Sequence, residues 1–143
     1  MRKIKFRGIP TDNNTSYDKE DGFVEGSLIK DNDKYYIVLE VIDNIKRDDY
    51  AICMIEVIPE TVRQYTGLKD KNGKEIYEGD IVKFRFKEDR EEFPDLIGYI
   101  EYQSTFAAFR IMSNQGSFKI DITEIKFIEK IGNIYDNPEL LEK

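Results

Sequence analysis

Short apolar runs separated by turn-forming residues are the main pattern along this chain. Phe23–Ile29, Tyr35–Ile42 and Ile81–Lys87 are rich in aromatic and β-branched residues, which favour strands, and Gly, Asn and Asp lie between such runs. Short strands with turn signals at intervals of about ten residues are typical of small barrels and sandwiches. The pattern therefore predicts an all-β fold.

The first part of the chain is predicted to form antiparallel strands. Lys3–Arg7 alternates basic and apolar residues, so one strand face carries Ile4 and Phe6 and the other face is basic. Phe23–Ile29 is expected to pair with Tyr35–Ile42 through a turn at Asp31-Asn32-Asp33. The nearly continuous apolar run Ala51–Ile58 predicts a strand that is buried on both faces.

A boundary is predicted near Pro59–Gln64. This segment favours a single helical turn, because Pro fits the first helical position, and Gly67 is expected to end the turn. The boundary gives an N-terminal β region at residues 1–64 and a small barrel with a terminal helix at residues 65–143. The barrel strands are predicted near Glu75–Ile76, Ile81–Lys87, Ile97–Gln103, Phe106–Met112, Phe118–Ile122 and Phe127–Ile131.

Two turn signals and one helix start lie in this second part. Asn72-Gly73 and Glu78-Gly79-Asp80 precede the first long barrel strand, and both glycines are expected at positive φ, where a Cβ atom would clash. Asn137-Pro138-Glu139 predicts the start of a short C-terminal helix, with Asn137 as its N-cap and Pro138 at its first position.

Charge and cysteine content restrict the class of protein. The chain has 143 residues, a net charge of −7 and no basic half, which argues against nonspecific binding to nucleic acid or to anionic membranes. The single cysteine, Cys53, excludes an intrachain disulfide, and residues 1–7 lack the apolar core of a signal peptide. We therefore expect a cytoplasmic protein.

The sequence offers little chemistry for catalysis. It has no histidine, which removes the commonest general base and most zinc sites, and no glycine-rich phosphate-binding motif. Cys53 lies between Ile52 and Met54, where a buried, inert thiol is favoured over a nucleophile. Asp31–Asp33 and Asp70–Gly73 resemble the start of a calcium loop, but neither has Gly at the sixth position or Glu at the twelfth. We predict no enzyme activity, no catalytic residue, no metal and no cofactor.

Two basic trios at alternate positions are the candidate nucleic-acid or partner face. They are Lys3, Lys5 and Arg7, and Lys83, Arg85 and Lys87. Each trio could line one strand face, and the alternative is that its charges point outward and protect an edge strand. The aromatic pairs Tyr35-Tyr36 and Phe106/Phe109 likewise either stack on bases or fill the core.

Four segments together resemble the YopX family of phage and prophage proteins. They are Arg2–Gly8, Tyr65–Asp70, Asn72–Val82 and Ile131–Leu141, so the resemblance extends over nearly the whole chain. It implies an all-β fold with an SH3-like barrel in the C-terminal part. The family has no assigned molecular function, so it implies no catalytic or ligand residue. The long polar segment Pro10–Asp21 departs from the shorter aromatic connection of many members.

The function that we favour is a phage accessory protein that binds another protein, or a second copy of itself, without catalysis. A small barrel has edge strands and grooves, which invite such contacts. We expect a homo-oligomer, with an unknown phage or host protein as a further partner. The alternative is a nucleic-acid-associated module of phage replication or transcription, for which the two basic trios are the support.

Overall fold

The computed structural model describes residues 2–12, 22–44, 49–88, 92, 94–120 and 124–142, with residues 40–44 and 49–53 described by their backbone alone. Within these residues the protein is all-β, as the sequence predicts, and its helical segments are short 3-10 turns. The chain divides into two units, Met1–Tyr65 and Thr66–Lys143. Among the described residues, no helix has the length and apolar character needed to cross a membrane.

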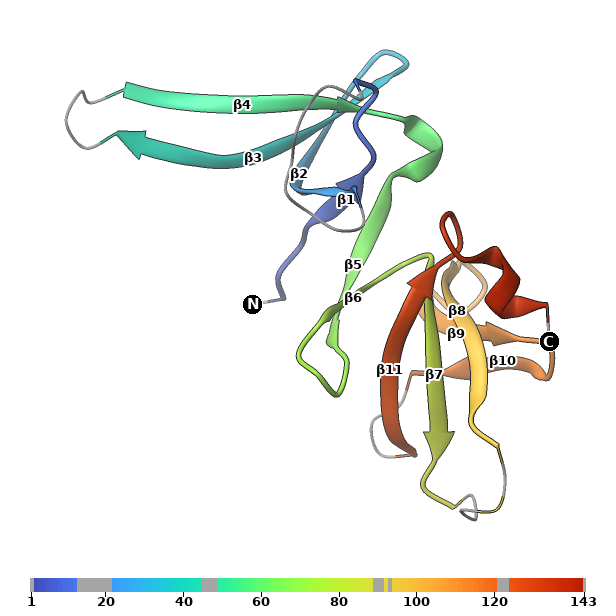
Figure 1. The fold of residues 1–143 in the computed structure, drawn as a ribbon. Helices are drawn as coiled ribbons and strands as arrows, with labels where there is room; N and C mark the ends of the chain where they lie inside the picture. The colour runs from blue at the N-terminus through green and yellow to red at the C-terminus, as the bar shows by residue number, and fades with distance from the viewer. Residues whose placement is uncertain are drawn as a thin grey trace. The chain divides into compact units, whose positions relative to one another are not determined.

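The N-terminal unit is built from antiparallel strands, coloured blue to green in Figure 1, in the order β4-β3-β2-β1-β5. They are β1 (Phe6–Gly8), β2 (Val24–Asp31), β3 (Lys34–Asn44), β4 (Asp49–Val57) and the beginning of β5 (Arg63–Lys69). The predicted hairpin is confirmed, since β2 and β3 pair from Ser27 opposite Val38 to Asp31 opposite Lys34. Asn32 in its turn has a φ of 54°, which Asn tolerates better than most residues.

One face of β4 packs into the core of this unit. Ile55 and Val57 are buried with Val24 and Ile37, whereas Met54 and Ile58 are exposed. The prediction of a strand buried on both faces is therefore wrong. β4 is the last strand in its sheet order, and an outer antiparallel strand needs only one apolar face. The side chain of Cys53 lies outside the described residues.

The prediction that Lys3–Arg7 forms a strand with one apolar and one basic face is also wrong. β1 begins only at Phe6, Ile4 before it is 61% exposed, and Arg7 is 1% exposed. The Arg7 guanidinium lies over the buried ring of Phe23, 4.2 Å from its centroid. β1 pairs with β2 on one side and with β5 on the other, so it is a covered strand and not a terminal edge.

Strand β5 was not expected from the sequence. The predicted helical turn is a shorter 3-10 turn, η1 (Pro59–Thr61), and the chain is extended again from Arg63. Gly67 lies within β5 at a φ of 88° and does not end a helix. β5 pairs with β1, where Gln64 is opposite Phe6, so its polar residues form a strand through pairing with a distant segment.

The C-terminal unit contains a five-stranded antiparallel sheet in the order β10-β9-β8-β7-β11, which curls into a half-barrel (Figure 1). Its strands, and β6 before them, follow the predicted segments with shifted ends. They are β6 (Glu75–Tyr77), β7 (Asp80–Phe86), β8 (Leu96–Gln103), β9 (Ala108–Ser113), β10 (Gly116–Lys119) and β11 (Ile125–Asn133). β7 pairs with β8 on one side and with β11 on the other, so it is an interior strand of the sheet.

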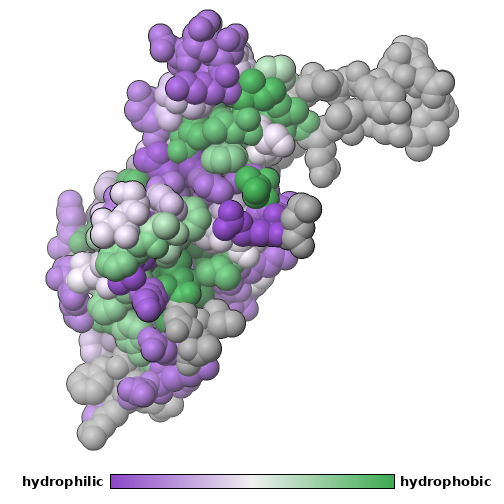
Figure 2. Space-filling model, turned by 180° about the vertical axis from the view of Figure 1, so that it is seen from behind, coloured by the Kyte–Doolittle hydropathy of each residue, from purple (hydrophilic) through white to green (hydrophobic). Residues whose placement is uncertain are grey.

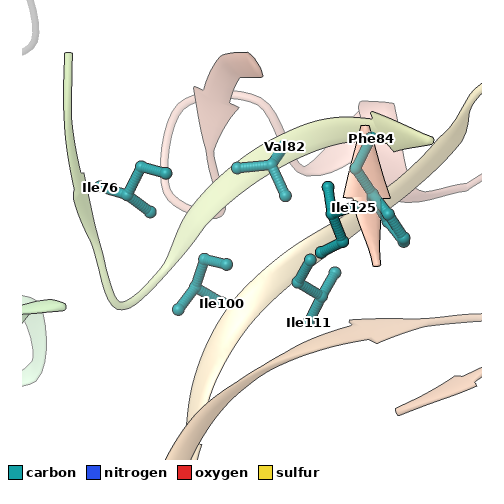
Figure 3. Packing of buried hydrophobic residues seen from close by; sticks show 6 residues of the cluster. All are labelled: Ile76, Val82, Phe84, Ile100, Ile111 and Ile125. Atoms are coloured by element: carbon teal, nitrogen blue, oxygen red, sulfur yellow. The ribbon is translucent and has the colours of Figure 1, made fainter. Parts of the chain in front are cut away.

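The concave face of this sheet holds the larger core. Figure 3 shows side chains from β6, β7, β8, β9 and β11 pointing toward one another. They are Ile76, Val82, Phe84, Ile100, Ile111 and Ile125, all at most 7% exposed. Phe84, Phe86 and Phe118 pack against one another, with ring centroids 5.3–6.0 Å apart. Burial of these apolar side chains is the main stabilising contribution of the unit.

Both predicted turn glycines are at positive φ, 81° for Gly73 and 87° for Gly79. In the second turn the buried carboxylate of Asp80 accepts a hydrogen bond from the backbone N–H of Tyr77 at 2.7 Å. Lys130 Nζ lies 3.3 Å from the other oxygen of the same carboxylate. Asp80 thus closes its own turn through Tyr77 and links that turn to β11 through Lys130.

The C-terminal segment is a four-residue 3-10 turn, η2 (Pro138–Leu141). Pro138 is at its start as predicted, but the side chain of Asn137 makes no capping hydrogen bond. Asn137 Oδ1 instead accepts a hydrogen bond from the backbone N–H of Asn133 at 3.3 Å. Asn137 is therefore the N-cap residue by position, as predicted, but its side chain does not cap η2, because its amide oxygen bonds to Asn133.

Candidate functional site

The N-terminal basic trio does not present three charges on one face. Lys3 is exposed, but Lys5 is half-buried, with its Nζ 3.4 Å from Glu25 Oε2 and 5.4 Å from the centroid of the Tyr65 ring. Arg7 is buried against Phe23. The side chains of Lys5 and Arg7 thus make their contacts inside the N-terminal unit.

The second trio lies on β7 and the residue after it, and two of its members form ion pairs. Arg85 Nε and Nη2 lie 2.8 and 2.7 Å from Asp95 Oδ1, and Lys83 Nζ lies 3.4 Å from Glu129 Oε2. Lys87 is exposed. The trio therefore leaves Lys87 as its most accessible charge.

Lys87 belongs to a pocket of about 340 Å³ that the sequence did not indicate, here called the lysine pocket. Its rim is formed by Lys69, Lys71, Lys87 and Lys126. Its apolar lining is formed by Leu68, Ile120, Ile125, Phe127 and Ile128. These residues come from β5, the turn after it, the end of β7, the end of β10 and β11. Three separate segments bring the four lysines together, so no local pattern reveals them.

Asp70 forms part of the wall of the lysine pocket and fixes its shape. Its Oδ1 accepts hydrogen bonds from the backbone N–H groups of Asn72 and Lys74, both at 2.9 Å. Its Oδ2 accepts one from the backbone N–H of Lys130 at 3.0 Å. Burial alone raises the pKa of Asp70, but these N–H donors outweigh it and the pKa lies below its usual value.

Glu129 joins the lysine pocket to the second basic trio. The carboxylate lies 3.3 Å from Lys71 Nζ as well as near Lys83, and hydrogen bonds from these two lysines lower the pKa of Glu129. Lys71 Nζ also lies 5.1 Å from the centroid of the Phe127 ring. All four lysines are exposed, but Lys71 is also held in place by these contacts.

A second pocket, of about 520 Å³, lies where η2 meets β8. Ile97, Tyr99 and Met112 of the sheet line it together with Leu140 and Leu141. Burial, together with the charge of Glu101, raises the pKa of Tyr99. None of the described residues that line it has a cationic side chain, in contrast to the lysine pocket.

The turn between β8 and β9 carries an exposed group of large side chains, here called the hairpin cluster: Tyr102, Phe106, Phe109 and Arg110. Tyr102 and Phe106 are 47% and 57% exposed. The Tyr102 and Phe109 rings meet edge to face at 5.4 Å, and the Arg110 guanidinium lies 4.2 Å from the Phe106 centroid. Hydrophobic residues also reach the surface elsewhere, as Figure 2 shows for one face.

Arg110 is itself held in place. Its Nε donates to Ser117 Oγ at 2.6 Å and its Nη2 donates to the Ser117 carbonyl at 3.0 Å. Ser117 thus fixes the position of the Arg110 guanidinium, which lies over the exposed Phe106 ring. Among the described residues, no group of three or more His, Cys, Asp or Glu side chains is placed to hold a metal ion.

Comparisons with known proteins give one family. The family model described as YopX protein matches residues 5–142. The chain belongs to the YopX protein family. A solved structure, the crystal structure of protein EF1440 from Enterococcus faecalis, is similar over 99% of both chains, with 25% identity and a TM-score of 0.59. No curated protein matches the chain.

Proposed function

We propose that this YopX-family chain is a phage- or prophage-encoded accessory protein of the bacterial cytosol that binds protein without catalysis. Its first partner is a second copy of itself, and a phage or host protein is a further one. The observation that carries this proposal is the exposure of Tyr102 and Phe106 in the hairpin cluster. Tyr, Phe and Arg are enriched in protein interfaces, where a few such side chains supply most of the binding energy.

The order within the hairpin cluster supports the same function. Phe109 and Arg110 hold the two exposed rings, and Ser117 holds Arg110. Side chains that are already ordered lose little conformational entropy when a partner covers them. The aromatic rings also offer a large contact area for few rotatable bonds.

Paired substitutions test this surface. Phe106→Ser and Tyr102→Ser should each weaken self-association about tenfold or more, since truncation of an interface anchor typically costs about 2 kcal/mol or more. Ile4→Ser is the matched control, because Ile4 is equally exposed but lies in the N-terminal unit. Sedimentation velocity over a dilution series measures the effect. Equal association of all four proteins would contradict the assignment of the hairpin cluster.

The alternative function is a nucleic-acid-associated module of phage replication or transcription. The observation that favours it is the lysine pocket, where exposed lysines accompany Phe127. The net charge of −7 and the ion pairs of Lys83 and Arg85 argue against it. Binding of labelled single-stranded and duplex DNA, followed by fluorescence anisotropy against salt concentration, tests it. A steep loss of affinity with salt would support this alternative.

We also propose that the C-terminal unit is an SH3-like barrel with Pro138–Leu141 as its short terminal helix. The sheet order supports this architecture, since β7 to β10 are consecutive neighbours and β11 returns to pair with β7. A crystal structure in which the two ends of the five-stranded sheet approach each other would support closure. A sheet that remains open at its β10 edge would contradict it.

A further inference from the structure

The rim of the lysine pocket is a concentrated positive charge in a protein of net charge −7. Lys69, Lys87 and Lys126 are exposed, and Lys71 completes the rim. Among the described residues of the lining, Asp70 supplies the one carboxylate, and it accepts three backbone hydrogen bonds from its own turn and from β11. Glu129 offsets part of the charge through Lys71. The remaining field favours an anionic ligand.

The lining between the lysines is apolar and, apart from Phe127, aliphatic. Leu68, Ile120 and Ile128 are only half-buried, so part of their surface faces the opening. A pocket of about 340 Å³ holds on the order of ten water molecules, which apolar side chains of a ligand would displace. An anion without apolar groups leaves this lining uncovered. The ligand that matches the whole pocket therefore combines negative charge with apolar side chains.

Two observations favour a peptide over a nucleic acid in this pocket. The Lys71 ammonium group lies over one face of the Phe127 ring, 5.1 Å from its centroid, so that face is a poor platform for stacking bases. A nucleic acid also carries a charge on every nucleotide, and a protein of net charge −7 repels it along its whole length. In a peptide, by contrast, the acidic side chains can be limited to the positions that contact the four lysines.

The pocket wall is formed before any ligand arrives. The backbone N–H of Lys71 donates to the carbonyl of Ile128 at 2.9 Å. The Asp70 carboxylate accepts a hydrogen bond from the backbone N–H of Lys130. These bonds join the rim segment at residues 69–74 to β11, which carries Lys126. A preformed wall lowers the entropy lost on binding.

We propose that the lysine pocket binds an acidic segment of a partner protein, with glutamate or aspartate side chains on the four lysines and apolar side chains on Leu68, Ile120 and Ile128. This site is separate from the hairpin cluster and does not depend on self-association. The occupant is a peptide segment in which acidic and aliphatic residues are interspersed. The contact is electrostatically guided and therefore weakens as salt rises.

The probe for this site is a short, capped, fluorescein-labelled peptide in which glutamate alternates with leucine, and its matched control has glutamine for glutamate. Anisotropy should show that the glutamate peptide binds the wild-type protein and that the glutamine peptide binds about tenfold more weakly. Lys87→Glu and Lys126→Glu should each weaken binding of the glutamate peptide by a similar factor. Lys30→Glu, a charge reversal of an exposed lysine in the N-terminal unit, should leave it unchanged.

Unchanged thermal unfolding of the three variants shows that they are folded, and amide chemical shifts of the wild-type protein locate the peptide. Absence of binding at millimolar peptide, or equal binding of the two peptides, would overturn the proposal. Tighter binding of a short oligothymidylate that is lost in Lys87→Glu and Lys126→Glu would assign the pocket to nucleic acid instead. Loss of self-association in Phe106→Ser with unchanged peptide binding would leave the two sites independent, as proposed.

Discussion

The carboxylate of Asp70 accepts a hydrogen bond from the backbone N–H of Lys130, 60 residues later in the chain, at 3.0 Å. The same carboxylate closes the turn that contains Gly73 through the N–H groups of Asn72 and Lys74. One side chain thus joins a local turn to β11 in the C-terminal unit. It also forms the wall of the lysine pocket.

Replacement of Asp70 should therefore destabilise the protein. Asp70→Asn keeps the size of the side chain but provides only one acceptor oxygen, so at least one of the three part-buried N–H donors loses its partner, at a cost of about 1–3 kcal/mol. Urea unfolding at neutral pH measures the change. Asp33→Asn, at an exposed turn, is the matched control and should have little effect.

The contribution of Asp70 should also depend on pH. Its folded-state pKa is below the reference value of 3.8, so folding favours the charged form and the stabilisation is fully present above that value. It is lost as the pH falls through the lower folded pKa. The difference in unfolding free energy between wild type and Asp70→Asn should thus shrink below about pH 3.8. A difference that stays constant with pH would contradict the role of the carboxylate.

The Asn72-Gly73 turn should tolerate few residues. Gly73 has a φ of 81°, and a Cβ placed on it would have no neighbour within 4 Å, so the cost of a substitution comes from the backbone alone. Gly73→Val should destabilise by about 1 kcal/mol or more, because a β-branched residue resists this conformation. Gly73→Asn should cost less, since Asn enters this region more readily. Equal thermal unfolding of both variants and wild type would show the turn assignment to be wrong.

Arg7 should behave as a core residue and not as part of a binding face. Its guanidinium is buried over Phe23, so Arg7→Ala removes both packing and a cation–π contact and should cost about 2 kcal/mol or more. Lys3→Ala, at the exposed end of the same predicted trio, should change the unfolding free energy by less than about 0.5 kcal/mol. Similar small effects of both substitutions would restore the basic face that the sequence predicted.

The sequence predicted those elements whose pattern is local. The alternation of apolar residues in β7 indicated which of its side chains point inward. The turn-forming neighbours of Gly73 and Gly79 indicated that both glycines have a positive φ. β5 was missed because its polar residues become a strand only through pairing with β1. The same pairing buries Arg7, which a reading of Lys3–Arg7 by itself places on a solvated face.

The candidate site was less predictable than the fold. Lys87 was singled out, but its companions Lys69, Lys71 and Lys126 come from segments that meet only when β11 pairs with β7 and the Asp70 turn joins β11. Lys83 and Arg85 were expected to share a face with Lys87, yet their partners Glu129 and Asp95 lie outside β7. Charge partners of this kind depend on register, which one sequence does not show.

Self-association is the central claim, and light scattering of the wild-type protein across dilution and salt tests it most directly. The net charge of −7 repels like subunits, and salt screens that repulsion, whereas contacts of the hairpin cluster are largely apolar. We predict a closed oligomer at tens of micromolar protein whose stability rises with ionic strength. A monomer mass at that concentration, in both low and physiological salt, would contradict the claim.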